Sequence, residues 1–211
     1  MNDIKDYNED LKSIKKIMEE TSRFLSLSGL SGIFAGFIAL AGGALAYLVI
    51  LKSHTFAYSE FFMNLSNNET SSMKIQLIIV ALLVLILALA GSLYFSYRKS
   101  LRTGQKIWTP VSKRMLINLL VPLATGGIYI LILYSKAQWL FIIPSMLIFY
   151  GLALVSAGKF TYNEVFYLGL IEIATGLICN VLPEYGIFFW CFGFGVLHLT
   201  YGLLMYRKYE R

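Results

Sequence analysis

Charged residues are scarce in this chain. Asp, Glu, Lys and Arg make up 14% of the 211 residues, whereas 57% of the residues are hydrophobic. A typical soluble domain has about 25% charged residues. The composition therefore excludes an ordinary soluble fold, and it leaves too little polar chain for a separate soluble domain. We expect a protein that has the lipid bilayer as its solvent and main partner.

Cysteine is nearly absent, and the sequence lacks the short motifs of common enzymes. Cys179 and Cys191 both lie in apolar stretches and form neither a CxxC motif nor a disulfide framework. There is no HExxH, no GxSxG and no pair of intramembrane aspartates. These absences argue against an enzyme, and we expect neither a cofactor nor a metal site.

Six long apolar stretches fill most of the sequence. A helix needs about 20 apolar residues to cross the ~30 Å hydrocarbon core of a bilayer. Strands are a poor alternative, because these stretches are apolar on all sides instead of alternating. The sequence thus predicts one all-α membrane domain over residues 24–206, preceded by an N-terminal segment (1–23) and followed by a short tail (207–211). The expected spans are residues 24–51, 75–97, 115–134, 139–158, 165–182 and 186–206.

Basic residues are distributed unevenly about these spans. If the N-terminus is inside, all but three of the 18 Lys and Arg residues lie inside, the exceptions being Lys52, Lys74 and Lys136. This is the pattern of the positive-inside rule. It predicts that both termini are cytoplasmic and that three helical hairpins each run in, out and in again. The net charge of +6 is then a signal of topology and does not indicate a nucleic-acid partner.

Two of the expected cytoplasmic segments are candidate contact surfaces. In residues 1–23, Leu11, Ile14 and Met18 recur at helical spacing between charged residues, which predicts an amphipathic helix. Such a helix either lies on the membrane surface or docks on a cytoplasmic protein. The basic loop over residues 98–114 either attracts anionic headgroups or binds a cytoplasmic protein.

A stripe of small residues runs along the first span. Ser28, Gly32, Gly36, Ala39 and Gly43 follow one another at steps of three or four residues. Small residues let helix backbones approach closely in lipid. The stripe predicts tight packing inside the bundle, and its alternative interpretation is a dimer face in a homo-oligomer.

A faint internal repeat links the hairpins. Leu-Ala-Thr-Gly at 123–126 resembles Ile-Ala-Thr-Gly at 173–176, and Tyr-Gly-Leu at 150–152 recurs at 201–203. Ser-Gly at 31–32 and Ala-Gly at 90–91 are the candidate counterparts in the first hairpin. Either the three hairpins are direct repeats, or these are chance likenesses among common membrane residues.

Two strongly ionisable side chains lie deep in the expected spans: Glu172 in the fifth and His198 in the sixth. Such residues are costly in lipid and commonly face the bundle interior or a cavity. The two are placed symmetrically about Tyr185, in the turn between these spans, so they should share one depth. We expect them to face each other, either as a structural pair that joins two helices or as a site for a proton or ligand.

Four further residues belong to this candidate region. Thr175 and Tyr201, from the repeated motifs, are additional candidates for binding a ligand or proton. Cys179 and Cys191 are also symmetric about the turn, one step of seven residues or ~10 Å away from the Glu–His pair. Because metal bonds are only about 2.0–2.3 Å long, one metal centre cannot join both levels. The cysteines are either apolar fillers or a possible disulfide or second layer of the site.

Two functions from different classes fit these features. One is a small transporter or channel-like module that binds a proton, a cation or a small, largely apolar ligand near Glu172 and His198. The scarcity of other polar residues in the spans argues against large polar solutes. The alternative is a membrane-embedded sensor or regulatory subunit that signals to a cytoplasmic protein.

The run from Met18 to Gly32, which contains Phe24-Leu-Ser-Leu-Ser-Gly-Leu-Ser-Gly32, resembles the opening of an uncharacterised family of small bacterial six-helix membrane proteins. The likeness rests mainly on the first 45 residues and on the six-span layout. No activity comes with the resemblance. It implies a location in the bacterial inner membrane and leaves the function open.

Overall fold

The computed structural model of this chain describes residue 24 and residues 27–51, 71–104 and 107–211. The amphipathic helix expected over residues 1–23 lies outside this set. Every regular element in the described part is a helix, as the long apolar stretches predict. In chain order the elements are α2 (Gly29–Leu51), α4 (Ser71–Thr103), α5 (Pro110–Ser135), η2 (Trp139–Phe141), α6 (Ile142–Gly158), α7 (Asn163–Val181), η3 (Pro183–Tyr185), α8 (Gly186–Trp190), the π-helix η4 (Cys191–Leu197) and α9 (His198–Tyr209).

Six helical stretches in the described residues are long and apolar enough to cross a bilayer. The first five correspond to α2, α4, α5, η2 with α6, and α7. The sixth, Pro183–Tyr209, consists of η3, α8, η4 and α9 in direct succession. α4 is the most exposed of them, with a mean hydropathy of 2.9 and only 6% of its apolar window buried. The chain is therefore an all-α, multi-pass membrane protein in which α4 presents most of its surface outward.

Several helices extend past their predicted spans. α4 and α5 are longer than expected at both ends, because polar and amphipathic turns continue the helices beyond their apolar cores. α5 begins at a capping box, in which Thr109 Oγ1 accepts from the Ser112 N–H at 3.1 Å and Ser112 Oγ accepts from the Thr109 N–H at 2.8 Å. α9 reaches Tyr209, so the last helix continues through residues 207–209.

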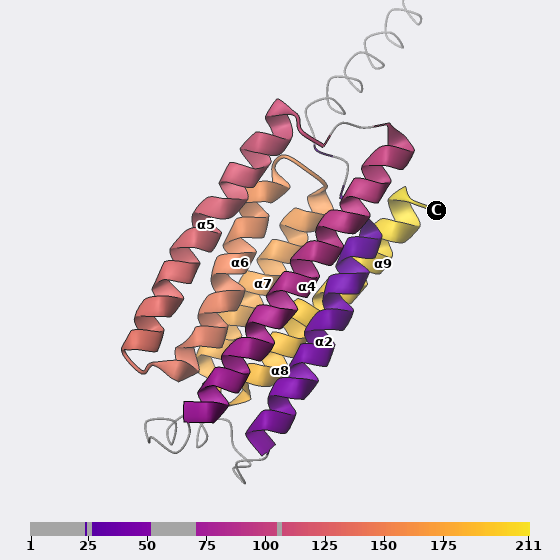
Figure 1. Cartoon of the computed structure of the whole chain (residues 1–211). Helices are drawn as coiled ribbons and strands as arrows, with labels where there is room; N and C mark the ends of the chain where they lie inside the picture. Colours follow the sequence, from indigo (N-terminus) through magenta and orange to yellow (C-terminus); the bar gives the residue numbers. More distant parts are fainter. Residues whose placement is uncertain (1–23, 25–26, 52–70, 105–106) are drawn as a thin grey trace, which may run out of the picture.

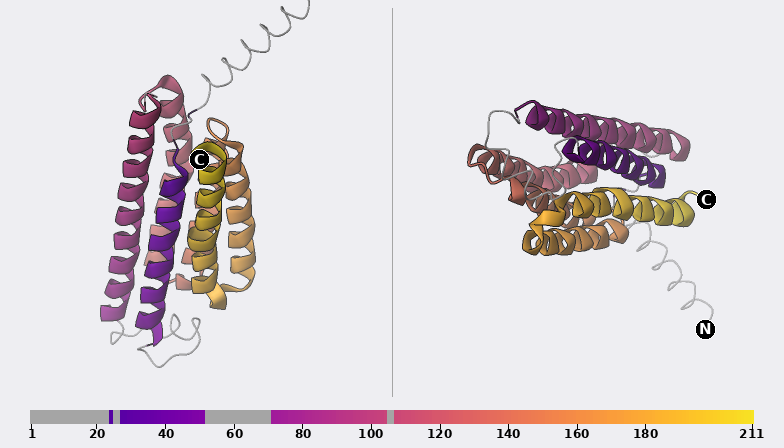
Figure 2. Two further views of the ribbon diagram at one scale, coloured as in Figure 1. Left: turned by 90° about the vertical axis from the view of Figure 1, so that its right-hand side faces the viewer. Right: turned by 90° about the horizontal axis from the view of Figure 1, so that it is seen from below.

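The six stretches lie side by side (Figure 1), and their contacts arrange them as an open ring. α5 packs along α6 and α6 along α7; the last stretch packs on α2, and α2 carries α4. α4 and α5 are the two ends of this series. In the end-on view of Figure 2, α4 lies outside α2, and α9 and α7 lie on the other side of α2. α4 and α5 are joined by a short connection but do not pack extensively on each other.

Glycine contacts join neighbouring hairpins. A Cβ on Gly151 of α6 would lie 2.7 Å from the carbonyl oxygen of Gly169 in α7, and one on Gly202 of α9 would lie 2.7 Å from that of Gly29 in α2. Gly151 and Gly202 are the glycines of the repeated Tyr-Gly-Leu motif, so the motif makes the same kind of backbone contact twice. The third contact is missing: Gly91 of α4 faces Phe34 of α2 and not α5. The ring is therefore open between α4 and α5.

The chain end is bound to the start of α2. Glu210 accepts hydrogen bonds from the Ser28 hydroxyl at 3.1 Å and from the Gly29 N–H at 2.5 Å. A carboxylate at this position satisfies free N–H groups and interacts favourably with the helix dipole. This explains why α2 begins at Gly29 and not at residue 24, where the apolar run starts. We refer to this end of the bundle as the Glu210 end and to the other as the Trp139 end.

Lys99 of α4 is held in the same cluster. Its ammonium lies 3.4 Å from Glu210 Oε1 and donates to the Leu27 carbonyl at 2.6 Å and to the Tyr162 hydroxyl oxygen at 3.4 Å. Burial raises the pKa of Tyr162 to about 12, so this hydroxyl stays neutral beside the lysine. Residues of the first and third hairpins thus share one buried polar cluster.

We expect Glu210→Ala to lower the free energy of unfolding by about 1–3 kcal/mol, because it removes a helix cap and leaves Lys99 without its carboxylate. The measurement is the thermal midpoint of the purified protein in detergent. Glu184→Ala is the matched control, since Glu184 is an exposed acid at the Trp139 end. Equal midpoints for the two variants would contradict the assigned role of Glu210.

Candidate ligand site inside the bundle

The fully buried Glu172 of α7 lies against the π-helix of the last stretch. A Cβ on Gly193 of η4 would lie 2.6 Å from Glu172 Oε2, so only a glycine leaves room for the carboxyl group. His198, the first residue of α9, has Nδ1 at 3.6 Å from Glu172 Oε1. The two ionisable residues that share a depth in the sequence are therefore side by side in the structure.

Two hydrogen bonds fix the His198 ring. Nδ1 lies 3.1 Å from the Gly193 carbonyl oxygen, and Nε2 lies 2.7 Å from the Tyr150 hydroxyl. Because a carbonyl oxygen only accepts, Nδ1 carries a hydrogen and donates it. In the neutral imidazole Nε2 is then the acceptor, and Tyr150 donates to it. Both ring nitrogens are satisfied without Glu172.

The Glu172 carboxyl group is left without such partners. Neither of its oxygens has a hydrogen-bond partner among the described residues. The 3.6 Å separation from His198 Nδ1 is too long for a hydrogen bond. A buried polar group in this state is costly, more so inside a membrane, and few native groups are left that way. Glu172 is therefore a fully buried acid whose two oxygens both lack a hydrogen-bond partner among the described residues.

The local geometry depends on the π-helix η4. Its sequence is Cys-Phe-Gly-Phe-Gly-Val-Leu, and π-helical turns of this kind are rare and frequent at functional sites. Its glycines face neighbouring helices on two sides. Gly193 meets Glu172 of α7, and Gly195 meets Leu40 of α2. The same turn therefore brings α7 and α2 close to the last stretch and places His198 beside the acid.

A cavity of about 480 Å³ lies inside the open ring, and we call it the large cavity. Its wall is built by α2, α4, α5, α6, α7 and the last stretch, and no Asp, Glu, Lys or Arg of the described residues lines it. Most of its lining is apolar. The polar side chains on its wall are Ser31, Ser92, Ser96, Tyr150, Thr161, His198 and Tyr201.

An aromatic wall runs along one side of the large cavity. Trp190, Phe194 and His198 follow one another along the last stretch, with ring centroids 5.6 Å and 6.2 Å apart. Tyr150 of α6 lies 5.2 Å from Phe194 and 5.4 Å from His198. Glu172 does not line the cavity, whereas its neighbour His198 does. The series Glu172, His198 and Tyr150 thus leads from a buried acid to an apolar chamber.

The remaining candidate residues have more ordinary environments. The buried Thr175 donates its hydroxyl to the Ile171 carbonyl of its own helix at 2.8 Å. Tyr201 lines the large cavity and lies beside Gly32. Cys179 and Cys191 are free thiols, so the disulfide considered from the sequence is not present. Cys191 Sγ lies against Gly43 of α2.

The stripe of small residues on α2 is covered by the chain itself. Gly32 lies against Gly202, and Gly36 lies against Gly195. Gly43 lies against Cys191, and Ser28 is bound by Glu210. A homo-oligomer formed through this face, the alternative considered from the sequence, would first have to displace α9 and η4.

Tyr150 and Gly193 were not among the site residues predicted from the sequence. Tyr150 is in the repeated Tyr-Gly-Leu motif, but nothing in the motif indicates that its hydroxyl meets His198 in another hairpin. Gly193 has a better signal, because two glycines separated by one residue inside an apolar span indicate close helix approach.

Comparisons with protein-family models, with curated proteins and with solved structures find no match to this chain. The functional argument therefore depends on the geometry of the cavity and of the three polar side chains beside it.

Proposed function

We propose that this protein is a non-enzymatic, transporter-like membrane module that binds a small, largely apolar ligand in the large cavity. The observation that carries the proposal is the cavity itself: about 480 Å³, mostly apolar, and bordered by one polar series that ends in Glu172. Cavities of roughly 300–1,000 Å³ with few polar groups are typical of small-molecule sites.

The lining favours an apolar ligand over a cation. A path for a hydrated ion needs rings of carbonyl, carboxylate or amide oxygens. Here no carboxylate of the described residues faces the cavity, and Tyr150, His198 and Tyr201 are the larger polar groups on its wall. These groups can orient one polar atom of a ligand while the rest of it remains in an apolar environment.

Glu172 supports coupling of ligand binding to a proton. A ligand that accepts the hydrogen bond of Tyr150 would free Nε2 of His198, which then becomes a site for a proton. An imidazolium so formed would have Glu172 as its nearest carboxylate, 3.6 Å from Nδ1. Binding and proton uptake would then favour each other. In this arrangement Glu172 has a role, which is to stabilise a protonated His198. A purely structural pair would not need an acid without a hydrogen-bond partner.

The distribution of basic residues supports an orientation with both termini cytoplasmic. The Glu210 end, with α4 ending at Thr103 and α9 at Tyr209, would then face the cytoplasm. Together with the family resemblance, this supports a bacterial inner-membrane protein. The cytoplasmic-partner alternative would involve residues 1–23 or the basic 98–114 connection.

We expect Ala88→Phe to weaken ligand binding by about tenfold, equivalent to about 1.4 kcal/mol, because a phenyl ring would fill space beside α4. Ala88 is a half-buried residue on the wall of the large cavity. The probe is 3-trifluoromethyl-3-phenyldiazirine, an apolar photoreagent. Its labelling of the peptides that carry Tyr150 and His198 is quantified by mass spectrometry at increasing probe concentration.

Ala90→Phe is the matched control, since Ala90 is an exposed residue of α4 that does not line the large cavity. The wild type and this control should show a saturable component of labelling, and Ala88→Phe should lose most of it. Labelling that rises linearly with probe concentration in the wild type would refute a ligand site in the large cavity.

A further inference from the structure

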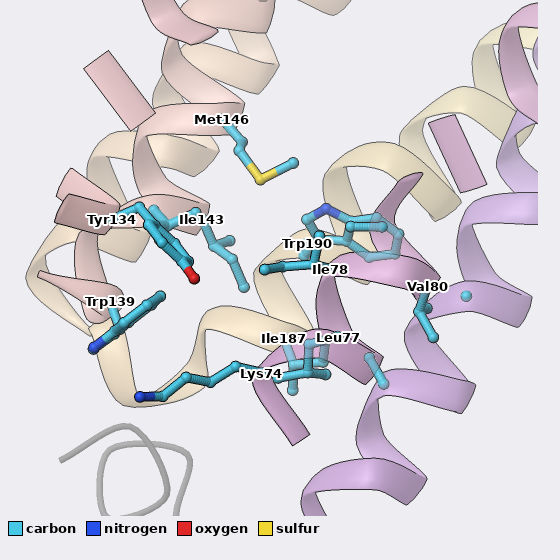
Figure 3. A pocket seen from close by; sticks show the side chains of 14 residues that line it. Lys74, Leu77, Ile78, Val80, Tyr134, Trp139, Ile143, Met146, Ile187 and Trp190 are labelled. Atoms are coloured by element: carbon cyan, nitrogen blue, oxygen red, sulfur yellow. The ribbon is translucent and has the colours of Figure 1, made fainter. Parts of the chain in front are cut away.

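A second cavity of about 180 Å³ lies at the Trp139 end, and we call it the Lys74 cavity (Figure 3). α4 forms one wall, η2 and α6 form the other, and Ile187 and Trp190 of α8 close it. It shares Ala81, Met146 and Trp190 with the large cavity, so the two chambers adjoin at these residues. A flexible apolar chain could therefore extend from one into the other.

Lys74 is the one charged side chain among the described residues that line either cavity. Its ammonium lies 5.4 Å from the centre of the Trp139 ring, and Tyr134 packs edge-on against the same ring at 4.6 Å. Figure 3 shows the lysine side chain extended beside Trp139 at the edge of the apolar chamber. No carboxylate in the described part of the chain is within ion-pair distance of it.

These three residues also share one depth in the membrane. The α4 span starts at Lys74, the α5 span ends just after Tyr134, and the η2–α6 span starts at Trp139. Lys, Tyr and Trp at span ends are typical of the level of lipid headgroups. The Lys74 cavity thus has a cation at headgroup depth and an apolar interior directed toward the bilayer centre.

We propose that the Lys74 cavity binds an anionic phospholipid of the surrounding bilayer, with its phosphate on Lys74 and one acyl chain in the Lys74 cavity. This inference goes beyond the proposed function, because it adds a lipid site next to the large cavity. The gap between α4 and α5 gives the lipid a lateral route, because these two helices do not pack extensively on each other. The second acyl chain remains in the bilayer.

A phospholipid fits better than a soluble anion or a fully apolar solute. A soluble anion would leave the apolar interior of the Lys74 cavity unfilled, and a solute without charge would make no use of the lysine. A bilayer lipid fills the apolar interior with an acyl chain and pairs its phosphate with the lysine, while its headgroup stays at its normal depth. The charge on Lys74 selects anionic over zwitterionic headgroups, and this selection is what the experiment measures.

The test uses full-length protein with Trp108→Phe, so that the two remaining tryptophans, Trp139 and Trp190, both line the Lys74 cavity. The protein is reconstituted in phosphatidylcholine bilayers with increasing fractions of dibrominated phosphatidylglycerol or dibrominated phosphatidylcholine. Bromine quenches tryptophan fluorescence on contact, so the curves give relative binding constants of the two lipids. We expect an about fivefold preference for phosphatidylglycerol, which corresponds to about 1 kcal/mol for one lysine.

Lys74→Gln should bring the ratio of the two lipids' binding constants close to one, whereas Lys136→Gln should leave this ratio unchanged. Lys136 is an exposed lysine at the same end that lines neither cavity. Equal quenching by the two lipids in the parent protein, or a preference that persists in Lys74→Gln, would overturn the inference. If the lipid preference failed in this way but saturable photolabelling of the large cavity remained, the proposed function would stand without the lipid inference. If saturable labelling were absent as well, the proposed function and the lipid inference would both fail.

Discussion

Gly202→Ala is expected to prevent the last span from packing on α2 and to reduce the yield of folded protein severely. A Cβ at this position would lie 2.7 Å from the Gly29 carbonyl oxygen and 2.8 Å from the carbonyl carbon of Gly32. Both are backbone atoms, so no side chain can move away. Overpacking of a well-packed core costs about 1–3 kcal/mol, and we expect at least the upper value here. The measurement is the monodisperse fraction and thermal midpoint in detergent.

Gly127→Ala is the control for this experiment. Gly127 is an exposed residue of α5 on the wall of the large cavity, and a Cβ there would meet nothing within 4 Å. Alanine is favoured over glycine inside a helix by up to about 1 kcal/mol, so this variant should be as stable as the wild type or more so. If both variants behaved alike, the contact between α9 and α2 would not be the tight junction that the structure shows.

The helices and the depth of the Glu–His pair were predictable because each follows from local sequence. Long apolar runs need only a count of residues against the thickness of a bilayer. The symmetry of Glu172 and His198 about Tyr185 places both at one depth in a hairpin, and the structure brings them within 3.6 Å. The sequence does not specify how each helix is rotated about its axis, so only the structure shows that the two side chains face each other.

Features formed between hairpins could not be predicted in the same way. Tyr150 completes the polar series from α6, and Glu210 reaches Gly29 from the other end of the chain. The opening between α4 and α5 depends on a contact that Gly91 does not make, since it faces Phe34. Nothing in the local sequence around these residues specifies their partners. The two cavities follow from this arrangement and were likewise not visible in the sequence.

Glu172→Met is expected to raise the free energy of unfolding by about 1–3 kcal/mol and to weaken the dependence of ligand binding on pH between 5 and 8, because an imidazolium at His198 would lose its nearest carboxylate. The stability gain follows because the carboxyl group is fully buried and its oxygens have no hydrogen-bond partner among the described residues. Methionine is unbranched, apolar and adaptable in shape, so it can occupy the space beside Gly193. The measurements are thermal midpoints in detergent and photolabelling of the large cavity across this pH range.

Removal of Glu172 leaves no other group unsatisfied, and this separates the two interpretations of the Glu–His pair. His198 already donates to the Gly193 carbonyl and is bound by Tyr150, so its hydrogen bonds survive the substitution. If Glu172 instead served as a structural partner of a charged His198, Glu172→Met would lower stability, by about 3–5 kcal/mol for a broken buried ion pair. Glu184→Met, at an exposed position, controls for the general effect of replacing an acid by methionine. A stabilised variant whose ligand binding depends less on pH would mean that the chain keeps this acid at a cost to folding, as expected of a residue retained for proton-coupled binding.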